Sequence, residues 1–147
     1  MPDIGLEEVP VVKVYNPSTI SAATFFGGPL VGSYLIAENF KALGSRRKAT
    51  ITWFVAILLI IFIIAIPQLF PSLSRMPNLP FIVLFTPIAG WTAKIFQSDA
   101  IKNHIEKGGN IYTLKRVVLI VLIGIAITVG LALLLFLIQD IVFIYSR

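Results

Sequence analysis

The stretch from Val117 to Gln139 contains no charged side chain and is almost entirely aliphatic. A helix needs about 20 predominantly apolar residues to cross the hydrocarbon core of a bilayer. An uncharged run of this length is typical of a membrane-spanning helix and much too long for a buried strand. We therefore expect residues 113–145 to form a spanning helix that reaches into the interface at its end.

The composition of the whole chain agrees with a membrane environment. Of its 147 residues, 57% are hydrophobic and 13% are charged, whereas soluble domains have about 45–50% apolar and about 25% charged residues. Cys is absent, which excludes a disulfide framework and thiolate metal sites. Three or four spans use the whole length, so we expect a single all-α transmembrane domain, an integral membrane helical bundle, over residues 1–147 with no separate soluble catalytic domain.

The other elements can be placed from apolar runs and from glycine and proline. Ser18 or Thr19 is the expected helix cap, and Gly44 the expected C-terminal end of the first helical segment. In chain order we expect an extended lead-in at 1–17, a broken helix at 18–44, spans at 49–70 and 79–96, and a short surface helix at 98–107. The pair Gly108–Gly109 is expected to end this surface helix.

The segment 18–44 is interrupted by Gly27, Gly28 and Pro29, which predict a break between two helical halves. If the segment spans as a kinked helix, the protein has four spans. If it forms a re-entrant or surface-lying hairpin, there are three spans and the N-terminus lies on the cytoplasmic side. We favour the kinked span, because a complete span satisfies its backbone hydrogen bonds more simply.

Basic residues predict the orientation. They concentrate in the loops 41–48 and 94–116, and the connector between the second and third segments contains only Arg75. The positive-inside rule places the two basic loops in the cytoplasm and the C-terminus on the other side. The net charge of +5 is explained by this membrane surface, so we expect membrane lipids and no nucleic acid as partners.

Side chains that carry out chemistry are scarce. The cores of the three strong spans hold no ionisable residue, which counts against proton coupling and against a membrane hydrolase. His104 is the only histidine and has no neighbours with metal-ligand spacing; a surface position is expected for it. We therefore expect no enzyme activity, no cofactor and no metal.

Gly124 and Gly130 predict close helix packing in the last span.

Two motifs carry a family resemblance. The first comprises Tyr15-Asn-Pro with Ile20, Ala23-Thr-Phe-Phe-Gly-Gly-Pro-Leu-Val-Gly32, Leu35-Ile-Ala and Asn39-Phe-Lys-Ala-Leu-Gly44. The second comprises Gln97, Ile101, His104 and the pair Gly108–Gly109, followed by a final long span. They resemble a family of small bacterial multi-pass membrane proteins, frequent among the Bacteroidota, that has no established activity. The resemblance implies a bacterial inner membrane, with a periplasmic C-terminus, and two motif regions on the cytoplasmic face. The candidate interaction or packing residues are Gly27, Gly28, Pro29, Asn39, Lys41, Gln97, His104, Gly108, Gly109, Gly124 and Gly130.

Three functional hypotheses follow from these observations. The leading one is a non-catalytic protein that binds another membrane protein or itself, as a subunit, an accessory factor or an immunity-type protein. The second is a small oligomeric channel or transporter, because discontinuous helices often line substrate sites. The third is a lipid-interacting protein that uses its basic interface on anionic headgroups.

Overall fold

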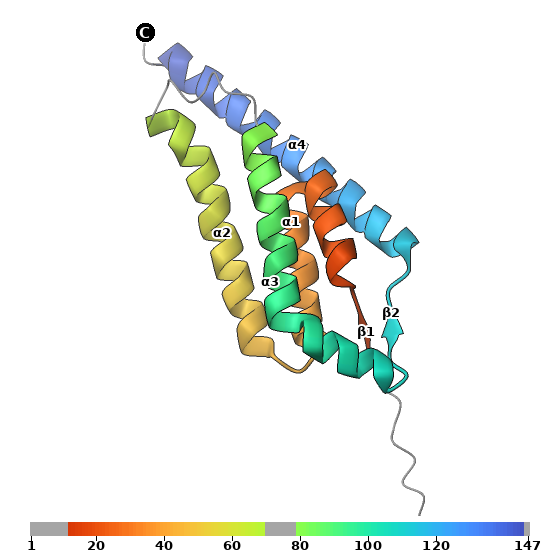
Figure 1. The fold of residues 1–147 in the computed structure, drawn as a ribbon. Coiled ribbons are helices and arrows are strands. Elements are labelled where there is room, and N and C mark those ends of the chain that lie inside the picture. The colour runs from red at the N-terminus through yellow and green to blue at the C-terminus, as the bar shows by residue number, and fades with distance from the viewer. Residues whose placement is uncertain (1–11, 70–78, 146–147) are drawn as a thin grey trace, which may run out of the picture.

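The computed structural model describes residues 12–69 and 79–145. This part is helical apart from two short strands (Figure 1), which confirms the all-α expectation. The first eleven residues of the lead-in and the proline-rich connector with Arg75 lie outside the described residues. In chain order the elements are β1 (Lys13–Val14), α1 (Pro17–Ala42), α2 (Arg46–Leu69), α3 (Leu79–Glu106), β2 (Asn110–Ile111) and α4 (Leu114–Tyr145).

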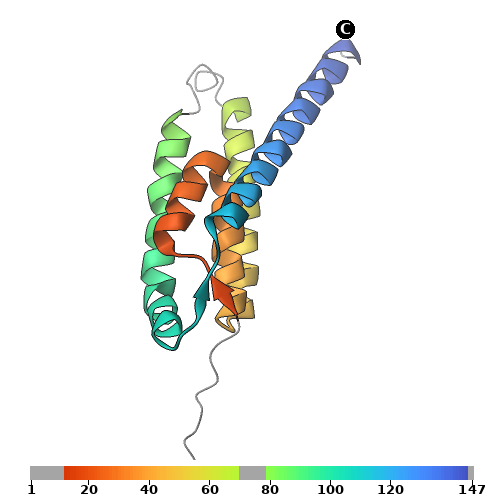
Figure 2. The same ribbon diagram turned by 90° about the vertical axis from the view of Figure 1, so that its right-hand side faces the viewer.

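Helix α1 is a hairpin of two helical arms rather than one rod. Gly28 has φ 74° and ψ −173°, a combination open essentially to glycine alone, and the chain reverses there (Figures 1 and 2). The amide of Tyr15 donates to Asn39 Oδ1 over 2.7 Å. An unbroken helix would hold residues so far apart in sequence about 36 Å from one another. Both ends of α1 therefore lie at the same end of the bundle.

This geometry corrects the favoured expectation of a kinked span at 18–44. Among the described residues, α1 and the Leu114–Ile138 part of α4 have the length and composition to cross a membrane. In α1, however, that length is divided between two antiparallel arms, 17–27 and 29–42. The hairpin alternative is the one that fits, because Gly28 turns the chain back and Pro29 begins the second arm.

The hairpin forms the centre of the bundle, and α2, α3 and α4 each pack against it. Most of the buried apolar side chains belong to α1, among them Ile20, Val31 and Leu35. Glycines allow α3 and α4 to approach α1 closely. A Cβ at Gly90 of α3 would collide with Ser21, and a Cβ at Gly124 of α4 would collide with Val31. The segment interrupted by glycine and proline is thus the one against which the other three helices pack.

Helix α3 continues through residues that were expected to form a separate surface helix. It runs unbroken to Glu106, and its last part bends away from the axis of the bundle (Figure 1). Gly108 then takes φ 80°, and Gly109 N donates to His104 O over 2.8 Å. The expected surface helix 98–107 is therefore the bent end of α3, closed by glycine as predicted.

The ends of α1 are partly as expected. Gly44 adopts φ 76° just beyond the last helical residue, which confirms it as the glycine that ends the helix. At the other end the cap is Asn16, whose side chain accepts from Ser18 N over 3.2 Å. The expected caps Ser18 and Thr19 lie inside the helix instead, because Pro17 occupies its first position, where a missing N–H costs nothing.

Two connections tie the lead-in to the start of α4. Strands β1 and β2 pair in parallel, with Lys13 opposite Asn110, and Tyr112 N donates to Val14 O over 3.0 Å.

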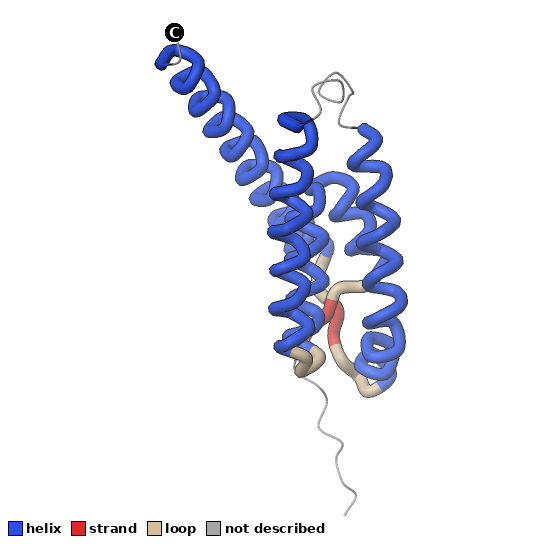
Figure 3. The backbone as a smooth tube through the Cα atoms, turned by 90° about the vertical axis from the view of Figure 1, so that its left-hand side faces the viewer, coloured by secondary structure: helices blue, strands red, loops and turns tan. Residues whose placement is uncertain are grey.

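Beyond its first turns α4 leaves the bundle (Figures 2 and 3), and the side chains of residues 125–138 are exposed.

The backbone at Gly28 gives a test of the hairpin. We expect Gly28→Ala to lower the free energy of unfolding by about 1–3 kcal/mol, because a side chain is strained at this φ and ψ. Detergent-titration unfolding followed by circular dichroism would measure the change. Gly130→Ala is the control: Gly130 is helical with nothing close to an added Cβ, so this variant should gain about 0.5–1 kcal/mol. Equal midpoints for the two variants would contradict the hairpin geometry.

Cysteine labelling gives a second test, since the chain has no Cys of its own. We expect Val12→Cys and Ser45→Cys to react with an impermeant thiol reagent from the same side of sealed vesicles, because the hairpin returns the chain to its starting side. Tyr145→Cys, at the far end of α4, should react only from the opposite side. Labelling of positions 12 and 45 from opposite sides would restore the kinked span.

Candidate functional site

A buried cluster of amides joins the lead-in, α1 and α3. The side chain of Asn39 accepts from Tyr15 N over 2.7 Å and donates to Tyr15 O over 2.8 Å, as a neighbouring strand would do. Asn39 Nδ2 also donates to Gln97 Oε1 over 3.1 Å, and Gln97 Nε2 donates to Ile36 O over 2.8 Å. Asn39 and Gln97 are fully buried, so these hydrogen bonds satisfy groups that would otherwise be costly to bury. The two amides from separate sequence motifs meet here.

Aromatic stacking extends this cluster to α4. The rings of Tyr15 and Tyr112 stack with centroids 4.4 Å apart, and the Arg116 guanidinium lies 4.2 Å from the centre of the Tyr112 ring. Arg116 Nε also donates to Tyr15 Oη over 3.1 Å. Burial raises the pKa of Tyr15 above its ordinary value, against the opposing effect of Arg116. The phenol is thus neutral at physiological pH and acts as an acceptor for the cation.

A polar hollow opens beside this stack. It has a volume of about 480 Å³ and is lined by Val12, Lys13, Tyr112, Thr113 and Arg116. Two of its lining side chains are cationic and exposed. An acidic group entering the hollow would meet Lys13 of β1 and Arg116 of the first turn of α4.

Positive charge collects at the same end of the molecule. All ten described lysines and arginines are exposed, and they occupy β1, the end of α1, the start of α2, the second half of α3 with the turn that follows it, and the start of α4. These parts meet at one end of the bundle (Figure 1). The acidic residues described in the same parts are Glu38, Asp99 and Glu106. This basic end is where the expected cytoplasmic loops lie.

His104 is more buried than expected. Its side chain is 8% exposed, and within residues 12–69 and 79–145 its Nε2 is buried without a hydrogen-bond partner. A Cβ at Gly109 would collide with the imidazole. Gly109 is therefore needed for packing next to His104, while Gly108 provides the positive φ that ends α3. The expected surface position of His104 is wrong because this glycine loop folds over it.

The remaining candidates are dispersed. Gly124 packs beside Gly27 and Val31, so it joins α4 to the turn of α1, whereas Gly130 faces open space. Lys41 forms an exposed ion pair with Glu38 at 2.7 Å, an interaction of little energetic value. Gly28 and Pro29 form the turn of the hairpin.

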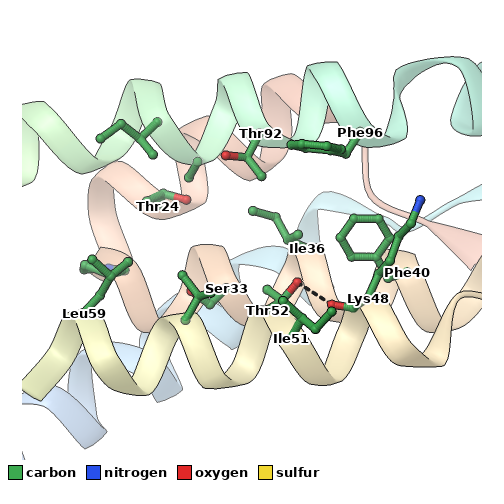
Figure 4. Close-up of a pocket in the computed structure, with 14 residues that line it drawn as sticks. Thr24, Ser33, Ile36, Phe40, Lys48, Ile51, Thr52, Leu59, Thr92 and Phe96 are labelled. Atoms are coloured by element: carbon green, nitrogen blue, oxygen red, sulfur yellow. Dashed lines mark hydrogen bonds between the residues drawn. The ribbon is translucent and has the colours of Figure 1, made fainter.

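An apolar groove lies between α2 and α3, with α1 as its floor (Figure 4). Its volume is about 380 Å³, and its walls include Val55 and Leu59 of α2 together with Ala89 and Phe96 of α3. Lys48 also lines it, with Nζ 5.8 Å from the centre of the Phe40 ring. The hydroxyls of Thr24 and Thr52 donate to carbonyls of their own helices. Ser33 and Thr92 add two further hydroxyls to a lining that is otherwise predominantly apolar.

The sequence analysis missed Tyr15, Tyr112, Arg116, Lys13 and Lys48 as site residues. Tyr15 had a signal, because it begins the Tyr15-Asn-Pro stretch of the first motif. The others are ordinary aromatic or basic residues near an expected membrane surface. Only the tertiary contacts bring them together.

Comparison of the chain with protein-family models, with curated proteins and with solved structures found no match. The resemblance to a bacterial membrane protein family thus stays a prediction.

Replacing one amide in the buried cluster tests its importance. We expect Asn39→Asp to destabilise the fold by about 3–5 kcal/mol, because a carboxylate cannot donate to Tyr15 O or Gln97 Oε1 and is a buried unpaired charge. The unfolding midpoint in mild detergent would report it. Asn103→Asp, the same change at an exposed position of α3, should stay within about 0.5 kcal/mol of the parent. Similar losses in both variants would contradict the assigned role of Asn39.

Proposed function

We propose that this chain is a multi-pass membrane protein that acts by binding a second membrane protein through its basic end. The polar hollow at Lys13 and Arg116 is the observation that carries the proposal. Cations held in fixed positions next to a helix start are suited to an acidic side chain of a partner. Binding is also the activity that needs no nucleophile, acid, base or cofactor.

The rigidity of the hollow supports this role. Arg116 is held by Tyr15 and Tyr112, and Tyr15 is held in turn by both polar atoms of the Asn39 side chain. The backbone of Lys13 is fixed through the pairing of β1 with β2. A preorganised pair of cations loses little conformational entropy on binding, which favours affinity.

The proposed topology follows from the hairpin and the charges. Helices α2, α3 and α4 span a bacterial inner membrane, and α1 enters and leaves it on the cytoplasmic side. The basic end is cytoplasmic by the positive-inside rule, and the end of α4 is periplasmic. The turn at Gly28 is compatible with membrane depth, because α2, α3 and α4 pack around the hairpin.

A self-associating channel is the second candidate, because the part of α4 beyond Gly124 is exposed and includes small residues such as Gly130. A channel requires copies of this chain around a common axis. The partner experiment therefore also distinguishes the two functions: adducts with a second copy would favour the channel, and an adduct with a different protein favours binding.

Photocrosslinking in intact cells tests the proposed interface. With p-benzoylphenylalanine at position 113, in the hollow, we expect one discrete adduct with another membrane protein. Adding Lys13→Gln should reduce the adduct at least about fivefold, since one charge near a membrane surface contributes about 1 kcal/mol. Mass spectrometry of the adduct band would identify the partner.

Lys102→Gln is the matched control. It makes the same charge change on the bent end of α3, outside the hollow, and should leave the adduct unchanged. Equal loss in both variants would show a general electrostatic effect and contradict a specific site at Lys13. A photoprobe at position 113 that gives no protein adduct would overturn the proposed function.

A further inference from the structure

The apolar groove between α2 and α3 has the features of a binding site. Its floor is formed by α1, on which α2 and α3 both pack, so the groove follows the long axis of the bundle. We propose that it holds one acyl chain of an anionic phospholipid, with the lipid headgroup at Lys48. This inference rests on the proposed placement of the basic end at the cytoplasmic surface.

The length of the groove matches one leaflet. Lys48 and Leu59 both line it, and eleven residues of helix separate them, which corresponds to about 16 Å along the axis. Half of the hydrocarbon core of a bilayer is about 15 Å thick. A chain lying in the groove with its headgroup at Lys48 therefore ends near the bilayer midplane, at the depth where the groove ends.

The positive charge at the Lys48 end of the groove favours an anionic headgroup. Arg46, Arg47 and Lys48 form the first turn of α2, which contains no acidic residue, so three cations meet the positive end of the helix dipole. Glu38, the described acid nearest in sequence, is bound to Lys41. Lys48 differs from its two neighbours in that it lines the groove. A phosphate there would relieve the repulsion among these three cations, which no acidic residue of the described ranges 12–69 and 79–145 is seen to pair.

A helix from a second copy fits the groove less well. The most exposed candidate is α4, which has no charged residue from Val117 to Gln139 and meets its first acid at Asp140. That residue lies at the opposite end of the bundle from Lys48 in the proposed topology. A docked α4 would therefore bury the mouth of the groove without pairing the lysine, whereas a phospholipid supplies both the apolar chain and the anion.

Native mass spectrometry of the full chain in mild detergent can test this. Dioleoyl phosphatidylglycerol and dioleoyl phosphatidylcholine, which share their acyl chains and differ in net charge, would be titrated separately. We expect a one-to-one adduct with each lipid, and we expect phosphatidylglycerol to bind at least about fivefold more tightly than phosphatidylcholine. One additional contact between a cation and an anionic headgroup provides a difference of this size. Inorganic phosphate and glycerol 3-phosphate at the same concentrations should not displace it, because they lack the acyl chain.

Two variants locate the site. Lys48→Gln should reduce phosphatidylglycerol binding to the phosphatidylcholine level, while Arg47→Gln, its neighbour in the same turn, should preserve the preference. Ala89→Phe fills the groove from α3 and should weaken both lipids, with circular dichroism as the check on folding. If Ala89→Phe does not fold, the comparison of Lys48→Gln with Arg47→Gln decides alone.

The proposal is overturned by equal affinity for the two lipids, by equal effects at positions 47 and 48, or by displacement with free phosphate. A failed photocrosslink at position 113 would remove the proposed protein partner and leave these lipid measurements unaffected. The two proposals therefore fail separately.

Discussion

The paired hydrogen bonds between the Asn39 side chain and the backbone of Tyr15 hold the two ends of α1 together. Because Tyr15 precedes the first arm and Asn39 belongs to the second, these bonds close the hairpin opposite its turn at Gly28. Gln97 joins α3 to the same cluster. Tyr15 in turn stacks on Tyr112 and accepts a hydrogen bond from Arg116, which positions both residues. The basic end has a defined shape because this buried amide is satisfied on every side.

A hairpin at the centre explains how a moderately apolar segment is accommodated. Hydrophobic burial alone does not draw helices together in lipid, so close packing and hydrogen bonds contribute more to assembly there. Glycines at positions 32, 90 and 124 allow neighbouring side chains to approach closely. Thr24 satisfies its hydroxyl within its own arm. Helix α1 thus supplies small and polar contacts, while α4 supplies an apolar surface that is exposed over most of its length.

The parts of this fold that depend on local sequence could be predicted. The uncharged run of α4, the break at Gly28 and the glycine ends at Gly44 and Gly108 all follow from one-residue preferences or from apolar length. The direction of the chain after Gly28 could not, because a glycine permits a reversal without requiring it, and the decisive bond joins Tyr15 to Asn39. The paired strands β1 and β2 were missed for a similar reason, since two residues carry no periodic signal.

The candidate site shows the same division. Asn39 and Gln97 were candidates because each belongs to one of the two motifs of the family resemblance, and the structure brings them into contact. His104 was expected at the surface because its helical neighbours are charged, but the fold of Gly109 covers it. Lys48 could not be separated from Arg46 and Arg47 by sequence, since only the packing of α2 directs one of the three along the groove.

The reliance of Asn39 on Gln97 has a consequence for biosynthesis. The two residues are separated by 58 positions, so at about 5–20 residues per second the ribosome delivers the second amide about 3–12 s after the first. During that interval both arms of α1 have been synthesised up to Asn39, and their polar groups still lack α3. In the proposed membrane topology, insertion during synthesis therefore involves an unfinished hairpin, and the hairpin closes only in the last third of synthesis.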